Sequence, residues 1–123
     1  MEDFKKWIEQ AKRDIKIAEY NLNGNFFESS IFYCQQAVEK SLKAIFIKRE
    51  GKLLKIHDLV ILGRKTNLPN EFLKKISGLN SAYTEARYGI SLGKIPAELF
   101  SKEEVSELLN LAKEILEWAE NQM

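Results

Sequence analysis

The chain contains one cysteine, Cys34, and one histidine, His57. A lone cysteine has no partner in its own chain, so an intrachain disulfide framework is excluded. The two residues together fall short of the ligand set of a usual zinc site, and we expect no metal and no cofactor. The sequence also lacks a glycine-rich phosphate loop, a GxGxxG fingerprint and a nucleophile elbow, which argues against the common nucleotide-cofactor enzymes and hydrolases.

Long apolar runs are missing as well. No stretch approaches the roughly 18 apolar residues that a membrane-spanning helix needs. The first residues, MEDFKKWIEQAKRD, are charged from Glu2 onward and do not resemble a basic-then-apolar leader. We therefore expect a cytoplasmic protein without a membrane segment.

The length of 123 residues suits one hydrophobic core, and we predict a single domain over residues 1–123. The net charge is only +1, but residues 40–75 carry ten basic side chains against three acidic ones. This excess indicates an anionic partner or an acidic protein surface. A lysine-rich face that contacts only solvent would give the same pattern.

Apolar residues recur every three or four positions through most of the chain, which is the pattern of amphipathic helices. Gly89, Gly93 and Pro96 predict an irregular loop over residues 86–100. No strand pattern is present, so we predict an all-α fold, an up-and-down antiparallel bundle of four to five helices. The predicted helices cover approximately 2–22, 26–49, 58–66, 69–83 and 101–123.

Two helix starts carry cap signatures. Gly24 is suited to ending the first helix, and Asn25 followed by Glu28 is close to a capping box for the second. Ser101 followed by Glu104 predicts a capping box for the last helix.

The stretch SAYTEARYGI, residues 81–90, gathers two tyrosines around an arginine at the predicted end of the fourth helix. Tyr83 and Tyr88 could stack on a base while Arg87 grips a phosphate. The alternative is a packed corner in which Tyr83 is buried and Arg87 pairs with Glu85 or another carboxylate. Both interpretations stay open on the sequence.

The second helix carries a semi-polar face in FYCQQAVEKSLKAIF, residues 32–46. Gln35, Gln36 and Lys43 either bridge to neighbouring helices or face a groove. His57 precedes Asp58 at a predicted helix start. It either holds that turn or reaches the Arg87 loop in space.

Three segments, QQAVEKSLKA from Gln35, HDLVIL from His57 and YTEARY from Tyr83, together resemble the HEPN domain, and the likeness spans nearly the whole chain. The resemblance implies a helical bundle that forms two-fold dimers. It also implies a minimal nucleotidyltransferase as partner, in a toxin–antitoxin-like pair.

Catalytic members of that family are metal-independent endoribonucleases with an arginine, four to six intervening residues and a histidine. The histidine moves protons for attack by the RNA 2′-hydroxyl, and the arginine stabilises the charged phosphorane. Arg87 matches the arginine, but the histidine positions hold Leu92, Gly93 and Lys94. Lys94 is a poor general base unless burial lowers its pKa, so the ribonuclease motif is incomplete.

The sequence thus predicts a HEPN-type module that binds a nucleotide or RNA and is the partner of a nucleotidyltransferase. One alternative is an active metal-independent endoribonuclease toxin that uses Arg87, and another is a helical protein-interaction adaptor. The candidate binding residues are Tyr83, Arg87, Tyr88, His57, Lys43 and Lys94.

Apolar residues off the main helical stripes also predict a homodimer, since they form more apolar surface than a small monomer should expose. They are Ile17, Tyr20, Phe32, Phe46, Leu111 and Trp118.

Overall fold

The computed structural model describes residues 3–123. It contains five α-helices, α1 (Phe4–Asn23), α2 (Phe27–Glu50), α3 (Leu59–Lys65), α4 (Asn70–Tyr88) and α5 (Lys102–Asn121), and two short 3-10 helices, η1 (Gly89–Leu92) and η2 (Pro96–Glu98). The described residues include no strand, so the prediction of an all-α fold is confirmed. The predicted first helical residue, Glu2, lies outside the described part of the chain. None of the helices within it is long and apolar enough to cross a membrane.

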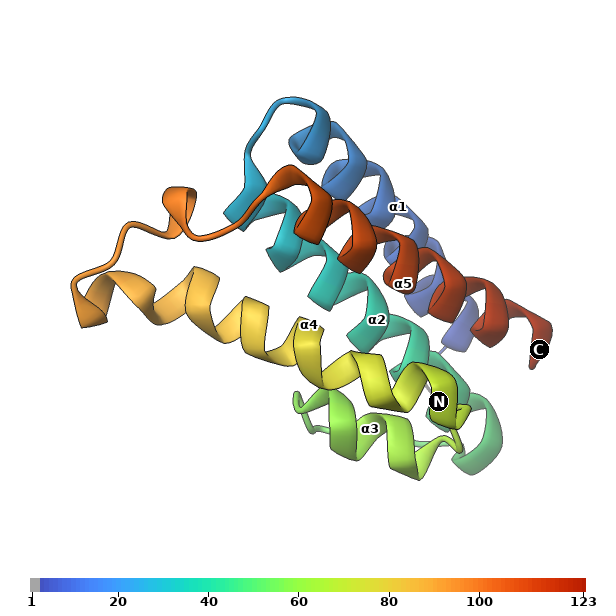
Figure 1. Ribbon diagram of the computed structural model, residues 1–123. Helices are drawn as coiled ribbons and strands as arrows, with labels where there is room; N and C mark the ends of the chain where they lie inside the picture. Colours follow the sequence, from blue (N-terminus) through green and yellow to red (C-terminus); the bar gives the residue numbers. More distant parts are fainter. Residues whose placement is uncertain (1–2) are drawn as a thin grey trace.

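Helix α2 is the centre of the fold (Figure 1). It packs against α1 and α5 and also against α4 and α3, while α1 and α5 contact each other. Its side chains Ile31, Val38, Leu42 and Ile45 are almost completely buried. A helix that is apolar around most of its circumference must be covered on several sides, and the four neighbours of α2 provide that cover.

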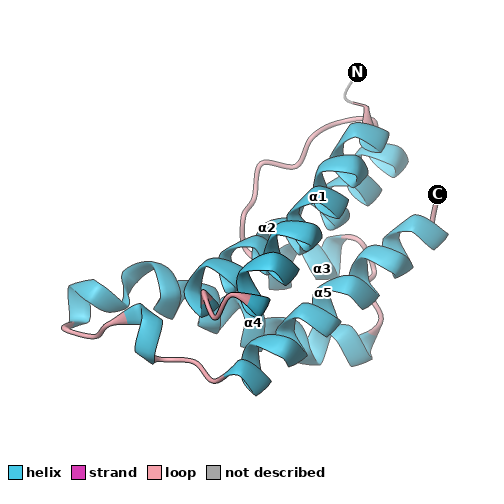
Figure 2. Ribbon diagram, turned by 90° about the horizontal axis from the view of Figure 1, so that it is seen from above, coloured by secondary structure: helices cyan, strands magenta, loops and turns pink. Residues whose placement is uncertain are grey.

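Helix α4 is longer than predicted. The sequence placed its end near Tyr83, yet the helix continues to Tyr88 and its backbone then tightens into η1. Gly89 does not end it, because its φ of −57° is helical. The left-handed turn comes only at Gly93, with φ 79°. The end of α4 and the segment 89–100 extend beyond α1, α2 and α5 in both views (Figures 1 and 2).

One predicted helix cap is wrong and one is confirmed. Asn25 adopts the left-handed conformation (φ 64°) in the α1–α2 turn, and α2 begins after Phe26 with no side-chain cap. Glu28 is therefore free of the capping box that the sequence assigned to it. The Ser101 box is present, because Ser101 Oγ accepts from the Glu104 amide at 3.1 Å and Glu104 Oε1 accepts from the Ser101 amide at 3.3 Å.

The apolar surface lies elsewhere than the sequence indicated. Of the six residues named for a dimer, Leu111 is buried, only Tyr20 is strongly exposed, and the other four are half-buried. A different exposed apolar group follows α4. It consists of Tyr88, Ile90, Leu92 and Ile95, each more than half exposed.

Candidate functional site

Tyr83, Arg87 and Tyr88 lie together at the end of α4, and we call them the arginine cluster. Because α4 remains helical here, Tyr83 and Arg87 are one turn apart on the same face. Arg87 Nη1 donates a hydrogen bond to Tyr83 Oη at 3.0 Å. The guanidinium carbon lies 5.9 Å from the ring centroid of Tyr83 and also 5.9 Å from that of Tyr88. Two aromatic rings therefore orient an exposed cation.

The arginine cluster holds a positive charge that no described carboxylate neutralises. Within residues 3–123 no carboxylate forms an ion pair with Arg87, so the alternative in which Arg87 pairs with Glu85 or another carboxylate is wrong. The interaction with Tyr83, and then that with Tyr88, raises the pKa of the Arg87 guanidinium, which is fully charged at any physiological pH. The remaining N–H donors of a fixed planar guanidinium match the geometry of phosphate oxygens.

A small cavity of about 70 Å³ lies between α2 and α4 beside the arginine cluster. Its lining consists of Glu28, Phe32, Tyr83, Ala86 and Arg87. The rings of Phe32 and Tyr83 stack with their centroids 6.0 Å apart. Glu28 Oε2 is buried and has no hydrogen-bond partner among the described residues.

Sequence reasoning missed Glu28 as a site residue because it assigned Glu28 to a cap. A signal was available in the spacing. Glu28 lies four residues before Phe32, and this spacing places both side chains on one face of α2.

Glu39, on α2, is the centre of a second polar group, which we call the Glu39 cluster: Gln35, Glu39, Lys43 and His57. Glu39 Oε1 accepts from Gln35 Nε2 at 3.0 Å, and Oε2 accepts from Lys43 Nζ at 3.0 Å. His57 Nδ1 lies 2.9 Å from the same Oε2. Since a carboxylate can only accept, this nitrogen carries the proton. Glu39 and Lys43 are buried, whereas the His57 side chain is 81% exposed.

The electrostatics of Glu39 favour its ionised form. Burial alone would raise the pKa of this carboxyl. The hydrogen bonds from His57, Gln35 and Lys43, together with the charge of Lys43, outweigh burial and hold the pKa below its usual value. Glu39 is therefore the counterion of the buried Lys43 ammonium.

Polar contacts extend from the Glu39 cluster to helix α1. Gln36 donates to Gln35 Oε1 at 2.8 Å, and Lys40 donates to Gln36 Oε1 at 3.2 Å. Lys40 also pairs with the buried Asp14 of α1 at 2.8 Å. The semi-polar face of α2 thus bridges to α1 through Lys40 and to the following linker through Glu39, whereas the hydrogen bonds of Gln35 and Gln36 stay within α2.

The structure separates the sequence-predicted site residues into two groups. Lys43 and His57 belong to the Glu39 cluster, and no contact among the described residues joins His57 to Arg87. His57 does not hold the start of α3, because Asp58 accepts from the amides of Val60 and Ile61 at 2.9 and 3.1 Å.

Lys94 lies after η1, in the segment that carries the exposed apolar side chains. Its amide donates to the Gly89 carbonyl at 3.0 Å, which closes the turn after α4. The Lys94 residue is exposed.

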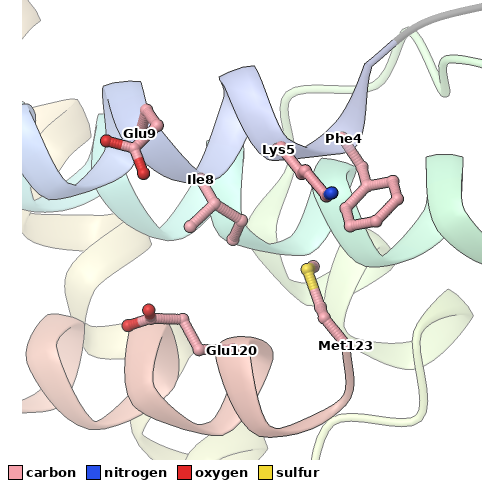
Figure 3. Close-up of a pocket in the computed structure, with 6 residues that line it drawn as sticks. All are labelled: Phe4, Lys5, Ile8, Glu9, Glu120 and Met123. Carbon is pink, nitrogen blue, oxygen red and sulfur yellow. The ribbon is translucent and has the colours of Figure 1, made fainter.

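A larger cavity of about 260 Å³ lies between the start of α1 and the end of α5 (Figure 3). Phe4 and Ile8 face Met123 and Glu120 across it. The cavity is at the opposite end of the bundle from the arginine cluster (Figure 1). It therefore contributes nothing to that site.

A small helical bundle with an aromatic-flanked arginine at the end of its fourth helix defines a class of all-α domain. The HEPN domain family matches residues 4–122, and the chain belongs to this family. The resemblance to the HEPN domain that the sequence indicated is confirmed.

Individual proteins that are similar to this chain in sequence or structure are consistent with this assignment. The chain is 29% identical over 129 residues to "Putative toxin MJ1304" of Methanocaldococcus jannaschii, a match that covers 92% of this chain and 83% of that protein. The crystal structure of TT1696 from Thermus thermophilus superposes with a TM-score of 0.89 at 26% identity and covers all of both chains. The crystal structure of ST0689, described as an archaeal HEPN homologue, gives a TM-score of 0.83 at 31% identity over 99% of this chain and 98% of its own.

Proposed function

We propose that this HEPN protein binds a nucleotide or RNA, with the phosphate at the arginine cluster. One observation carries the proposal: Arg87 is exposed, makes no ion pair with a carboxylate among the described residues, and is held between two tyrosine rings. Guanidinium donors bind phosphate oxygens, and exposed aromatic faces stack on bases. Lys94 lies on the same projecting segment and adds positive charge.

The second part of the proposal concerns partners. A relative that is named as a toxin supports a role in a toxin–antitoxin-like pair, and we propose a minimal nucleotidyltransferase as the other member. The exposed Ile90, Leu92 and Ile95 provide an apolar surface beside the arginine cluster. Such a surface suits a protein contact, with a second copy of this chain or with the partner.

A metal-independent endoribonuclease is the second candidate function. The toxin name of the relative favours it, and so does the exposure of Arg87, since this guanidinium is free to stabilise a phosphorane. The proton-transfer group is the weak point, because Leu92, Gly93 and Lys94 occupy the histidine positions. We therefore rank binding above cleavage.

Calorimetric titration with a short mixed-sequence RNA tests the binding proposal. Arg87→Ala should lower the affinity about tenfold or more, because charge-assisted hydrogen bonds are lost. Arg13→Ala, which removes an arginine from α1, far along the chain from the arginine cluster, should leave the affinity unchanged. The affinity of the wild type should fall as salt rises. Equal binding by both variants, or an affinity independent of salt, contradicts the proposal.

Incubation of the same RNA with wild-type or Arg87→Ala protein in the presence of EDTA separates the two candidate functions. Cleavage by wild type that is lost in Arg87→Ala would establish a metal-independent ribonuclease. Binding without cleavage would establish the binding module.

A further inference from the structure

Glu28 Oε2 is a buried acceptor that has no donor within residues 3–123. A carboxylate oxygen removed from water without a hydrogen bond is energetically unfavourable, and such groups are rare in folded proteins. Arg87 lines the same cavity and is a candidate donor within the protein. Arg87 donates to Tyr83 instead, and the two charged side chains form no ion pair in the described part of the chain.

The position of this acceptor connects it to the proposed phosphate site. Glu28 lies on the α2 side of the cavity, and Tyr83 and Arg87 lie on the α4 side. A cavity of about 70 Å³ admits one edge of a nucleobase but not a whole base. The rest of the base would lie at the surface, where Arg87 and Tyr88 are exposed. One nucleotide can therefore contact Glu28 and Arg87 together.

The chemistry of a carboxylate selects among the bases. It accepts hydrogen bonds and donates none when ionised. Guanine presents two adjacent donors, N1–H and the 2-amino group, which match the two carboxylate oxygens. Adenine and cytosine place an acceptor nitrogen beside their amino group, and uracil flanks its single N–H with two carbonyls, so each sets an acceptor against the carboxylate.

From this arrangement we propose that Glu28 reads the base of the bound nucleotide and that the preferred base is guanine. The inference rests on the proposed nucleotide-binding function and gives it a substrate class. Arg87 holds the phosphate, and Glu28 accepts from the Watson–Crick edge of the base. Oε2 has almost no accessible surface in this structure, so rotation about the terminal torsion of the Glu28 side chain must turn it toward the base. The carboxylate then gains its hydrogen bonds only in the complex, which is the condition for strong discrimination against a base that lacks the donors.

The test is calorimetric titration of wild type and of Glu28→Gln with GMP, IMP, AMP and UMP. All four ligands share the phosphate and ribose, so differences report on the base alone. Wild type should bind GMP about tenfold or more tightly than AMP and UMP. IMP keeps N1–H but lacks the 2-amino group, so its affinity should lie between them.

The Glu28→Gln substitution should change which base is preferred, rather than only weaken nucleotide binding. Its amide offers one acceptor and one donor, which complements adenine, so the GMP-to-AMP ratio of affinities should fall about tenfold or more. Glu103→Gln on the exposed start of α5 should leave the ratio unchanged. Thermal unfolding confirms that each variant is folded.

The outcomes separate this inference from the function it rests on. Equal affinity for the four nucleotides, or an unchanged ratio in a folded Glu28→Gln variant, overturns base reading by Glu28. If Arg87→Ala still lowers the affinity about tenfold or more in that case, the phosphate site stands. Absence of binding to every nucleotide and to RNA overturns both.

Discussion

The Glu39 cluster and the arginine cluster both place charged groups between α2 and a neighbouring segment, but they satisfy those groups differently. In the Glu39 cluster each charged group has a partner, and both carboxylate oxygens accept hydrogen bonds. Among the described residues, the Arg87 guanidinium of the arginine cluster has no carboxylate partner. Oε2 of Glu28, which lines the same cavity, has no hydrogen-bond donor there.

Under the proposed function, this difference separates a structural polar group from a binding site. A buried charge that is fully paired holds elements in register, and breaking the pair is destabilising. Charged groups that stay unpaired within the protein are available to a ligand that supplies the missing contacts. Substitutions in the Glu39 cluster should therefore affect stability, whereas those in the arginine cluster should affect binding.

The largest expected effect is that of Glu39→Ala. It leaves the buried Lys43 ammonium without a counterion, and the free energy of unfolding should fall by about 3–5 kcal/mol. Urea unfolding monitored by circular dichroism measures it. Glu103→Ala, at an exposed position, should change stability by less than about 0.5 kcal/mol. Similar losses in the two variants would remove the distinction between the clusters.

Acid should weaken the Glu39 cluster selectively. The folded-state pKa of Glu39 lies below its ordinary value of 4.5, so the unfolded chain takes up the proton more readily. The contribution is complete above about pH 4.5 and is lost as the pH falls through the lower folded-state value. The unfolding free energy of wild type, measured over this range, should fall more steeply than that of Glu39→Gln. Parallel curves would show that Glu39 makes no such contribution.

In the arginine cluster, Tyr88→Leu should reduce RNA affinity by a smaller factor than Arg87→Ala. It removes a cation–π contact and a stacking face but keeps the guanidinium, and an exposed contact of this kind contributes about 0.5–1 kcal/mol. Fluorescence anisotropy with a labelled RNA should show a loss of about two- to fivefold. A loss as large as that of Arg87→Ala would indicate that stacking, rather than phosphate contact, dominates.

The smallest expected effect is that of Arg87→Ala on stability. The guanidinium is exposed and its interactions are local to the end of α4, so the unfolding free energy should change by less than about 0.5 kcal/mol. The same urea titration measures it. A loss of several kcal/mol would make Arg87 a structural residue and would undermine its assignment to binding.

Periodicity was sufficient to predict the helices because the apolar residues of α1, α2 and α5 repeat at helical spacing on the faces that become buried. It failed at the end of α4 because Gly89 was interpreted as a break. Glycine permits a left-handed turn but does not impose one. That error concealed the i,i+4 relation of Tyr83 and Arg87.

The sequence indicated the residues of the site but not their grouping. Lys43 and His57 were placed with Arg87. Lys43 contacts Glu39 within α2 at i,i+4 spacing, whereas only the packing of the linker after α2 brings His57 to Glu39. The spacing of Glu28 and Phe32 places both on one face of α2, but only the packing of α4 against α2 brings that face to Tyr83 and Arg87. Pairing of charges between distant segments is a property of tertiary structure and leaves little trace in local spacing.

The most direct test of the central claim is a map of amide chemical-shift changes in ¹⁵N-labelled protein titrated with GMP. The account predicts changes concentrated in residues 28–32 and 83–94, with the amides around Glu39, Lys43 and His57 unmoved. Changes centred on the Glu39 cluster, with the end of α4 unaffected, would contradict it.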